Sequence, residues 1–272
     1  MRGKYVLYET IIFINCTRCI SSTGFCSILN FYFILIFFVI ALLYSSVGFG
    51  GGSSYIAFLL LFNVPYEMIP IIALSCNLVV VSGGAFHYIK NKQVEAKLIL
   101  PFIVTSIPFA YLAGLIQIEK DTFKLVLGAF LLIAGIRMVV RIKRDYSENK
   151  IPPFWVSSLL GAFLGFISGL VGIGGGIFLS PIMYNLKWGK PKQISALCCL
   201  FIFFNSIAGL AGQLQKTNSF DSASSYWGLI LAVFIGGQIG SHLGSNRLKP
   251  RYIEILTAVL VIVVALRIFF FS

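Results

Sequence analysis

The chain has 272 residues, of which 58% are hydrophobic and only 11% are charged, and its formal net charge is +12. Soluble domains usually carry about 25% charged residues, so this composition excludes a soluble enzyme, a nucleic-acid module and a disordered chain. The basic residues occur in short clusters between long apolar runs, which is typical of membrane-protein loops rather than of a surface that binds nucleic acid. The composition therefore predicts an integral membrane protein, with the lipid bilayer as a partner and no nucleic-acid partner.

The first 27 residues differ from the rest of the chain. Residues 1–27 carry several basic residues and only a short apolar stretch, with no small-residue cleavage pattern, so they make a poor signal peptide and are interpreted as a tail. Cys16 and Cys19 have the C-x-x-C spacing, but no second pair or neighbouring histidine accompanies them. A zinc site is therefore not expected, and the sequence predicts no cofactor and no metal.

Apolar runs without Asp, Glu, Lys or Arg mark the candidate membrane spans. A helix crosses the hydrocarbon core in about 20 residues. Runs of this length, some with charges only near their ends, are 68–89, 98–118, 122–141, 193–215, 222–246 and 252–271. Two further blocks, 28–63 and 151–186, are longer than one crossing needs. The pattern predicts an all-α polytopic fold.

Each long block is interrupted by glycine near its middle. The first contains Val47-Gly48-Phe49-Gly50-Gly51-Gly52, and the second contains Val171-Gly172-Ile173-Gly174-Gly175-Gly176. Three consecutive glycines cost roughly 1 kcal/mol each in a helix relative to alanine, so these runs predict unwound backbone at membrane depth. Such backbone needs hydrogen-bond partners and must be buried in protein or line a polar cavity.

The two glycine runs belong to an internal repeat. Residues 28–145 and 151–272 each contain one broken block followed by three ordinary spans. Two arrangements are possible. If each broken block is a hairpin that enters and leaves the membrane on one side, the two halves are inverted and most basic loops lie on the same side of the membrane. If each block crosses the membrane fully, the two halves are parallel. We favour inversion, because basic loops concentrate on the cytoplasmic side and inverted repeats with broken helices recur in transporters.

These features resemble the sulfite exporter TauE/SafE family of membrane transporters. The similar segments are Ser45–Ser54 with Ala73–Asn77, Gly165–Pro181 with Gln193–Cys199, and the glycines from Gly236 to Gly244. The resemblance covers about residues 30–272. It implies a multi-pass protein of the cell membrane that moves small sulfur-containing anions such as sulfite or sulfonates.

The glycine breaks are the candidate substrate-binding site. Freed amide groups at the start of a helix carry about half a positive charge and can hold an oxyanion without a buried cation. The predicted site residues are Gly50, Gly51, Gly52, Ser53, Ser54, Asn77, Gly174, Gly175, Gly176, Ser180 and Asn205. The serines and asparagines have an alternative role, since such residues often only bond neighbouring helices in membranes. Gly161, Gly165 and Gly169, at a spacing of four, are interpreted as packing glycines.

The predicted function is secondary transport of a small anion by alternating access, with a proton or sodium ion as the possible coupling ion. The sequence lacks G-x-S-x-G, H-E-x-x-H and a P-loop lysine, so no enzyme is expected. A non-transporting scaffold protein is the main alternative, and it leaves the duplicated glycine runs without a purpose. His87 and His242 are interpreted as interfacial or packing residues, although an ionisable group within a membrane span is a functional candidate by default.

Overall fold

The computed structural model describes residues 24–61, 64, 68–116, 152–216 and 227–249, together with the single residues 252, 255, 256 and 259. Within these ranges the chain forms helices and short connections and contains no β-strand, so the predicted all-α fold is confirmed. The helices are α2 (Gly24–Ser46), α3 (Gly52–Leu61), α4 (Ile69–Lys90), α5 (Ala96–Gly114), α7 (Phe154–Val171), α8 (Gly176–Leu186), α9 (Pro191–Lys216), α10 (Trp227–His242) and the π-helix η2 (Leu243–Arg247). The predicted span 122–141, most of the predicted span 252–271 and most of the tail 1–27 lie outside the described residues.

Several helices are long and apolar enough to cross a membrane. In the described part of the chain these are Ile69–Lys90, Ala96–Gly114, Phe154–Val171, Pro191–Gln215 and Gly228–Arg247. Phe154–Val171 belongs to the second broken block, so that limb alone has the length of a span. Large apolar side chains also point outward, and Trp155 and Leu159 on α7 are 71% and 67% exposed. This much exposed apolar surface is suited to lipid rather than water.

Both predicted breaks are present, and each separates a long helix from a short one. In the second break α7 ends where Gly172 adopts a φ of 77° and its amide donates to the Ser168 carbonyl oxygen at 2.8 Å. This left-handed cap is the usual place for glycine, because a Cβ atom disfavours positive φ. Helix α8 then begins after Gly175, whose φ is also positive. The predicted interruption of the helix is therefore confirmed in both blocks.

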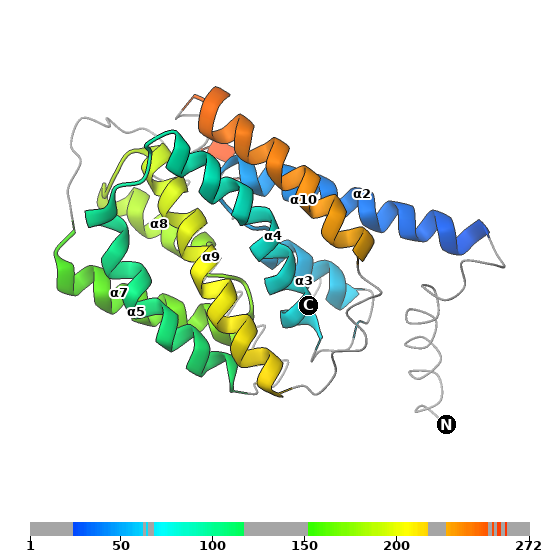
Figure 1. Cartoon of the computed structure of the whole chain (residues 1–272), viewed down its shortest axis with the longest axis horizontal. Coiled ribbons are helices and arrows are strands. Elements are labelled where there is room, and N and C mark those ends of the chain that lie inside the picture. The colour runs from blue at the N-terminus through cyan, green and yellow to red at the C-terminus, as the bar shows by residue number, and fades with distance from the viewer. Residues whose placement is uncertain are drawn as a thin grey trace.

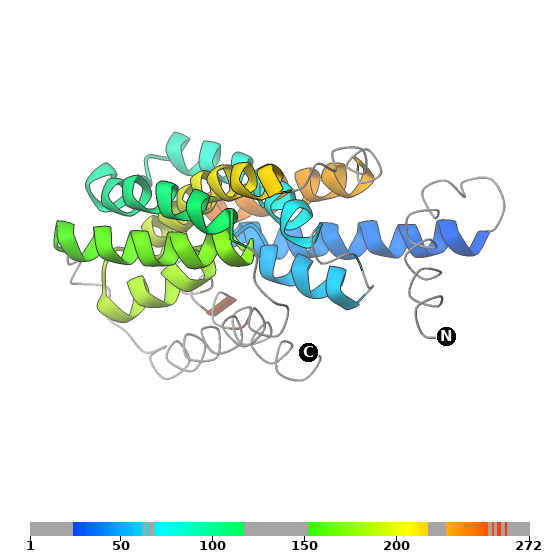
Figure 2. The same cartoon turned by 90° about the horizontal axis from the view of Figure 1, so that it is seen from below.

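The two broken blocks form hairpins that approach from opposite ends of the molecule. Figure 2 shows α3 turning back beside α2 toward the right, and α8 turning back from α7 toward the left. Their tips, the segments 47–51 and 172–175, meet in the middle, where a Cβ atom at Gly52 would lie 3.0 Å from the Ile173 carbonyl oxygen. Around them α2 packs on α10 and α5 packs on α7, while α4 and α9 pack together at the centre (Figure 1). Each hairpin's long helix therefore lies against a helix of the other predicted half.

Glycines allow these helix pairs to approach closely. On α7, a Cβ atom at Gly161, Gly165 or Gly169 would collide with the backbone of α5. Gly236 and Gly240 on α10 and Gly244 on η2 meet the carbonyl oxygens of Phe38, Leu42 and Ser46 in α2 in the same way. Small residues at a spacing of four are a common device for helix association in membranes. The interpretation of Gly161, Gly165 and Gly169 as packing glycines is confirmed.

We expect Gly165→Leu to lower the thermal midpoint of the purified protein. A Cβ atom at this position would lie 2.5 Å from the Ser106 carbonyl oxygen, so α5 and α7 would have to separate. Overpacking of this kind typically costs about 1–3 kcal/mol. Gly228→Leu is the matched control, because Gly228 is exposed and its Cβ atom would lie at an ordinary 3.4 Å from Ile34. Equal midpoints for both variants in detergent would contradict this description of the interface.

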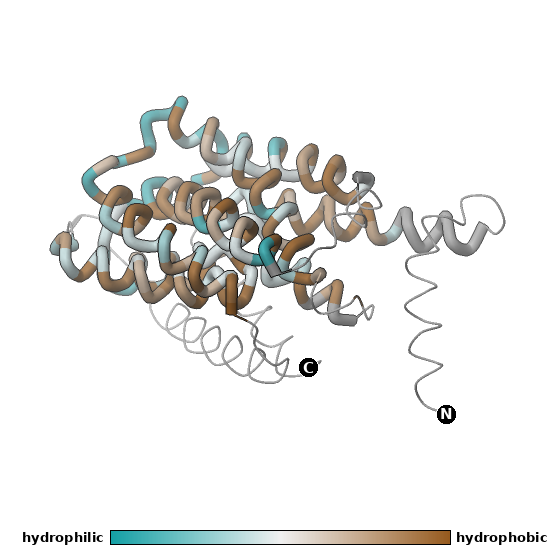
Figure 3. Tube along the Cα trace, turned by 60° about the horizontal axis from the view of Figure 1, so that its bottom comes forward, coloured by the Kyte–Doolittle hydropathy of each residue, from teal (hydrophilic) through white to brown (hydrophobic). Residues whose placement is uncertain are grey.

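One end of the bundle is strongly basic. The residues Lys90, Lys92, Lys97, Lys187, Lys190, Lys192, Arg247 and Lys249 lie in or beside the loops after α4, before α9 and after η2. Hydrogen bonds hold these loops together. Gln93 Nε2 and Lys192 Nζ donate to the Ser245 carbonyl oxygen at 3.0 and 2.9 Å, and Gln193 Nε2 donates to Glu95 Oε2 at 3.0 Å. The hydrophilic segments at the upper left of Figure 3 mark this end, which we call the basic end.

Candidate functional site

Asn77 of α4 joins the two breaks. Its Nδ2 donates to the Ile173 carbonyl oxygen of the second break at 2.9 Å, and the side chain is fully buried. Gly50 and Gly52 of the first break pass so close to the Asn77 amide that a Cβ atom at either would collide with it. A Cβ atom at Gly174 would lie 3.3 Å from Asn77 Nδ2. The structure therefore brings four predicted site residues and the Ile173 carbonyl group together at one point.

The short helices start at this point, and their first amides have no acceptor within the helix. In α3 the Gly51 carbonyl oxygen accepts from Ser54 and Tyr55, each at 3.0 Å, so the helix provides no acceptor for the earlier amides of Gly52 and Ser53. In α8 the Gly175 carbonyl oxygen accepts from Phe178 and Leu179 at 3.1 and 3.2 Å. The amides of Gly176 and Ile177 are left in the same way.

Because α3 and α8 run outward from the centre in opposite directions, their N-termini face each other (Figure 2). Each N-terminus carries a partial positive charge, and the two add at the centre.

Several buried polar atoms around the breaks have no hydrogen-bond partner. They are Asn77 Oδ1, both side-chain polar atoms of Asn205, and the hydroxyl groups of Ser168, Ser206 and Tyr55. Three of these lie directly beside break glycines, measured from the position of an added Cβ atom. Tyr55 lies 3.1 Å from Gly51, Ser206 lies 3.2 Å from Gly174, and Ser168 lies 3.3 Å from Gly175. Buried polar groups in native proteins are nearly always satisfied, so this cluster needs a polar solute or water.

Asn205 is placed on α9 between two residues that touch the second break. Ser206 follows it beside Gly174, and Phe201, one turn earlier, lies against Gly175. The Asn205 side chain is fully buried with neither polar atom bonded. Burial of an amide without a hydrogen bond is costly, which favours a role in binding over a role in helix packing.

The predicted serines are less closely joined to the centre. Ser54 is paired with the Tyr44 hydroxyl at 2.8 Å within the first hairpin, and Ser180 is buried in α8. The Ser54 hydroxyl group thus serves a helix contact, the alternative that the sequence left open. Ser53 is buried in the first turn of α3. Its backbone amide has no acceptor within the helix, so this amide is its candidate binding group.

Sequence reasoning missed Ser168, Ser206 and Tyr55. A usable signal was present, because Ser168 lies one helical turn before Gly172 and Tyr55 lies one turn after Gly51. Residues one helical turn apart lie on the same face of a helix. Polar side chains one turn from a break glycine were therefore reasonable candidates.

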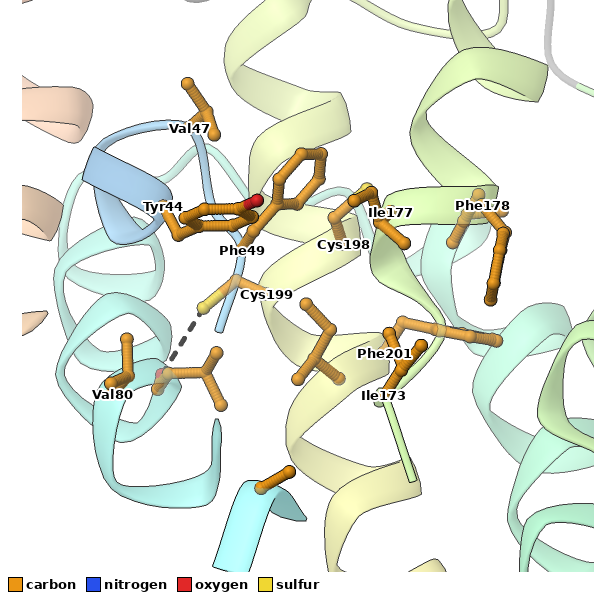
Figure 4. Close-up of a cluster of buried hydrophobic side chains, with 14 of the residues drawn as sticks. Tyr44, Val47, Phe49, Val80, Ile173, Ile177, Phe178, Cys198, Cys199 and Phe201 are labelled. Carbon is orange, nitrogen blue, oxygen red and sulfur yellow. Dashed lines mark hydrogen bonds between the residues drawn. The ribbon is translucent and has the colours of Figure 1, made fainter. Parts of the chain in front are cut away.

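Apolar side chains enclose the polar centre. Figure 4 shows Val47 and Phe49 of the first break, Ile177 of α8 and Phe201 of α9 in one buried cluster. Apart from tyrosine hydroxyl groups, the buried polar side chains of the described residues are serine, asparagine and glutamine, and none of them is charged. The same residues contain no group of three or more His, Cys, Asp or Glu side chains that could hold a metal ion. An anion at this centre would therefore be bound by amides and hydroxyls in a low-dielectric surrounding.

Comparison with known proteins supports a membrane transporter. The family model described as sulfite exporter TauE/SafE matches residues 33–268. The chain is 33% identical to the probable membrane transporter protein y4hK of Sinorhizobium fredii over 85% of this chain and 95% of the relative. It is 29% identical to a probable membrane transporter protein of Methanocaldococcus jannaschii over 82% of this chain and 89% of the relative. No solved structure matches the chain.

The matched range contains both glycine breaks and every predicted site residue. These relatives are described as transporters and not as enzymes, in agreement with the sequence-based expectation. The exposed apolar helices place the chain in a membrane. The chain is a multi-pass cell-membrane transporter that belongs to the sulfite exporter TauE/SafE family.

Proposed function

We propose that this transporter carries a small oxyanion, of the class of sulfite or a sulfonate, bound between the two glycine breaks. The observation that carries the proposal is the group of unpartnered buried polar atoms beside two facing helix N-termini. Amide and hydroxyl donors suit the several acceptor oxygens of such an anion. The name of the matched family is consistent with this substrate class.

The absence of a buried cation among the described residues favours turnover. A full positive charge in a low-dielectric centre would hold an anion strongly, whereas partial charges on amides bind it and release it. The polar centre also lies where the two hairpins meet, so movement of one predicted half against the other would expose it to either side. Such a movement would give alternating access around a fixed site, as in other transporters built from inverted repeats.

The proposed halves, 28–145 and 151–272, are inverted relative to each other. In an inverted arrangement the loops 90–97 and 187–192 share one face, and in a parallel arrangement they lie on opposite faces. The hydrogen bond from Gln193 to Glu95 at 3.0 Å supports inversion. Basic loops accumulate on the cytoplasmic side, so we assign the basic end to the cytoplasm.

Flux measurements in proteoliposomes test the proposal. We expect labelled sulfite, a sulfonate or thiosulfate to enter protein-containing vesicles at a rate that saturates with concentration, unlike protein-free vesicles. A dependence on an imposed proton or sodium gradient would identify the coupling ion. A rate that rises linearly without saturation would indicate a channel, and no flux of any small anion would favour the scaffold alternative.

A further inference from the structure

The chain contains only two histidines, and the fold brings them together at the basic end. His87 of α4 and His242 of α10 lie 155 positions apart in sequence, yet their ring centroids are 5.4 Å apart with an interplanar angle of 72°. Helix α4 belongs to the first predicted half and α10 to the second. The histidine pair therefore joins the two parts of the molecule that must move during transport.

Polar side chains lie beside the two rings. The Gln238 amide of α10 lies against α4, in the space where a side chain at Gly83 would lie. The Nδ1 atom of His242 is 3.1 Å from Asn246 Nδ2, and Asn246 Oδ1 accepts from Asn91 Nδ2 at 2.7 Å. The pair is thus part of a polar connection that runs from α4 through α10 and η2 to the loop after α4.

The surroundings of the pair oppose a second positive charge. Lys90 lies on α4, Lys92 follows it, Lys192 lies on α9 and Arg247 lies on η2. Glu95, the only acidic residue in the described part of the chain, accepts a hydrogen bond from Gln193 instead. Two imidazolium rings at this separation repel each other, and no carboxylate in the described part contacts either ring to offset that repulsion.

We propose that His87 and His242 form a proton-sensitive contact that closes the basic end. With at most one proton on the pair, the rings pack and α4 stays against α10. A second proton drives the rings apart and loosens the contact between α10, η2 and the loop after α4. The claim that this loosening admits the solute rests on the proposed function; the proton-sensitive contact does not.

Imidazole NMR tests the contact without any transport measurement. Histidine labelled with carbon-13 gives two signals, since the chain has two histidines. We expect the two rings to take up protons in separate steps in the wild-type protein. In His242→Gln, the His87 ring should take up its proton at a higher pH than in the wild type, because the repulsion from the second ring is removed. Independent titration, unchanged by removal of the other ring, would overturn the proposal.

Hydrogen exchange tests the loosening. In the wild type we expect amides of 84–93 and 238–248 to lose about tenfold protection between about pH 7.5 and about pH 5.5, after correction for intrinsic exchange. The single glutamine variants should keep the same protection at both values. A His87→Lys, His242→Lys double variant, charged throughout, should be poorly protected at both. The proton-sensitive contact would be refuted if the wild type were equally protected at both pH values. It would also be refuted if the single variants lost as much protection as the wild type. Either result would hold even if anion flux were established.

Discussion

Asn205→Leu should strongly reduce anion flux while leaving the thermal midpoint unchanged or raised. Both polar atoms of Asn205 are buried and unpartnered, so they destabilise the empty protein, and leucine, which has the same branched shape, removes that cost. Bound anion would lose hydrogen bonds worth about 1.5–3 kcal/mol, which corresponds to roughly 10- to 100-fold in affinity. Flux in proteoliposomes and thermal unfolding of the same preparation measure the two effects.

A matched control lies on the same helix. Gln215 of α9 is exposed and accepts a hydrogen bond from the Tyr111 hydroxyl group at 3.0 Å, outside the proposed site. Gln215→Leu makes the same amide-to-leucine exchange and should leave the flux near that of wild type. Normal flux in Asn205→Leu would remove this residue from the site. A lowered thermal midpoint in Asn205→Leu would show that the Asn205 amide stabilises the fold and is not an unpartnered group.

Gly51→Leu and Gly175→Leu should each reduce flux by at least about tenfold. The φ angles of Gly51 and Gly175 are 89° and 79°, where a residue with a Cβ atom is strained by about 1–3 kcal/mol. A Cβ atom at Gly175 would also lie 2.8 Å from the Phe201 ring. The first turn of the following helix would shift, and its amides would no longer point at the anion.

Two alanine variants keep this prediction testable if the leucine variants do not fold. Gly51→Ala and Gly175→Ala add one methyl group, retain the strain at positive φ and displace less of the surrounding structure. We expect intermediate flux in reconstituted protein of normal size-exclusion behaviour. Full flux in every folded variant at both positions would show that the break geometry is not required for transport.

Much of the architecture could be predicted from the sequence, because charged residues delimit the membrane helices and glycine runs interrupt them. Charge-free runs predicted helices α4, α5, α9 and α10, and the glycine runs predicted where the two long blocks unwind. Both signals have strong local causes, namely the cost of burying charge in lipid and the cost of three glycines in a helix.

The packing partners could not be predicted in this way. Helices that are apolar on all sides have no amphipathic face, so nothing local in α2 indicates that it packs on α10. The bond from Asn77 to Ile173 and the meeting of His87 with His242 join distant segments and depend on that packing. The sequence predicted Asn77 as a site residue but gave no information on its acceptor.

The most direct test of an anion site between the two glycine breaks is an experimental structure of the transporter with sulfite, a sulfonate or another transported anion bound. We predict density for the anion between the two breaks, within hydrogen-bond distance of the amides that begin α3 and α8 and of Asn205 or Asn77. Density for the anion away from both breaks, with the cluster of polar atoms occupied only by water, would contradict the central claim.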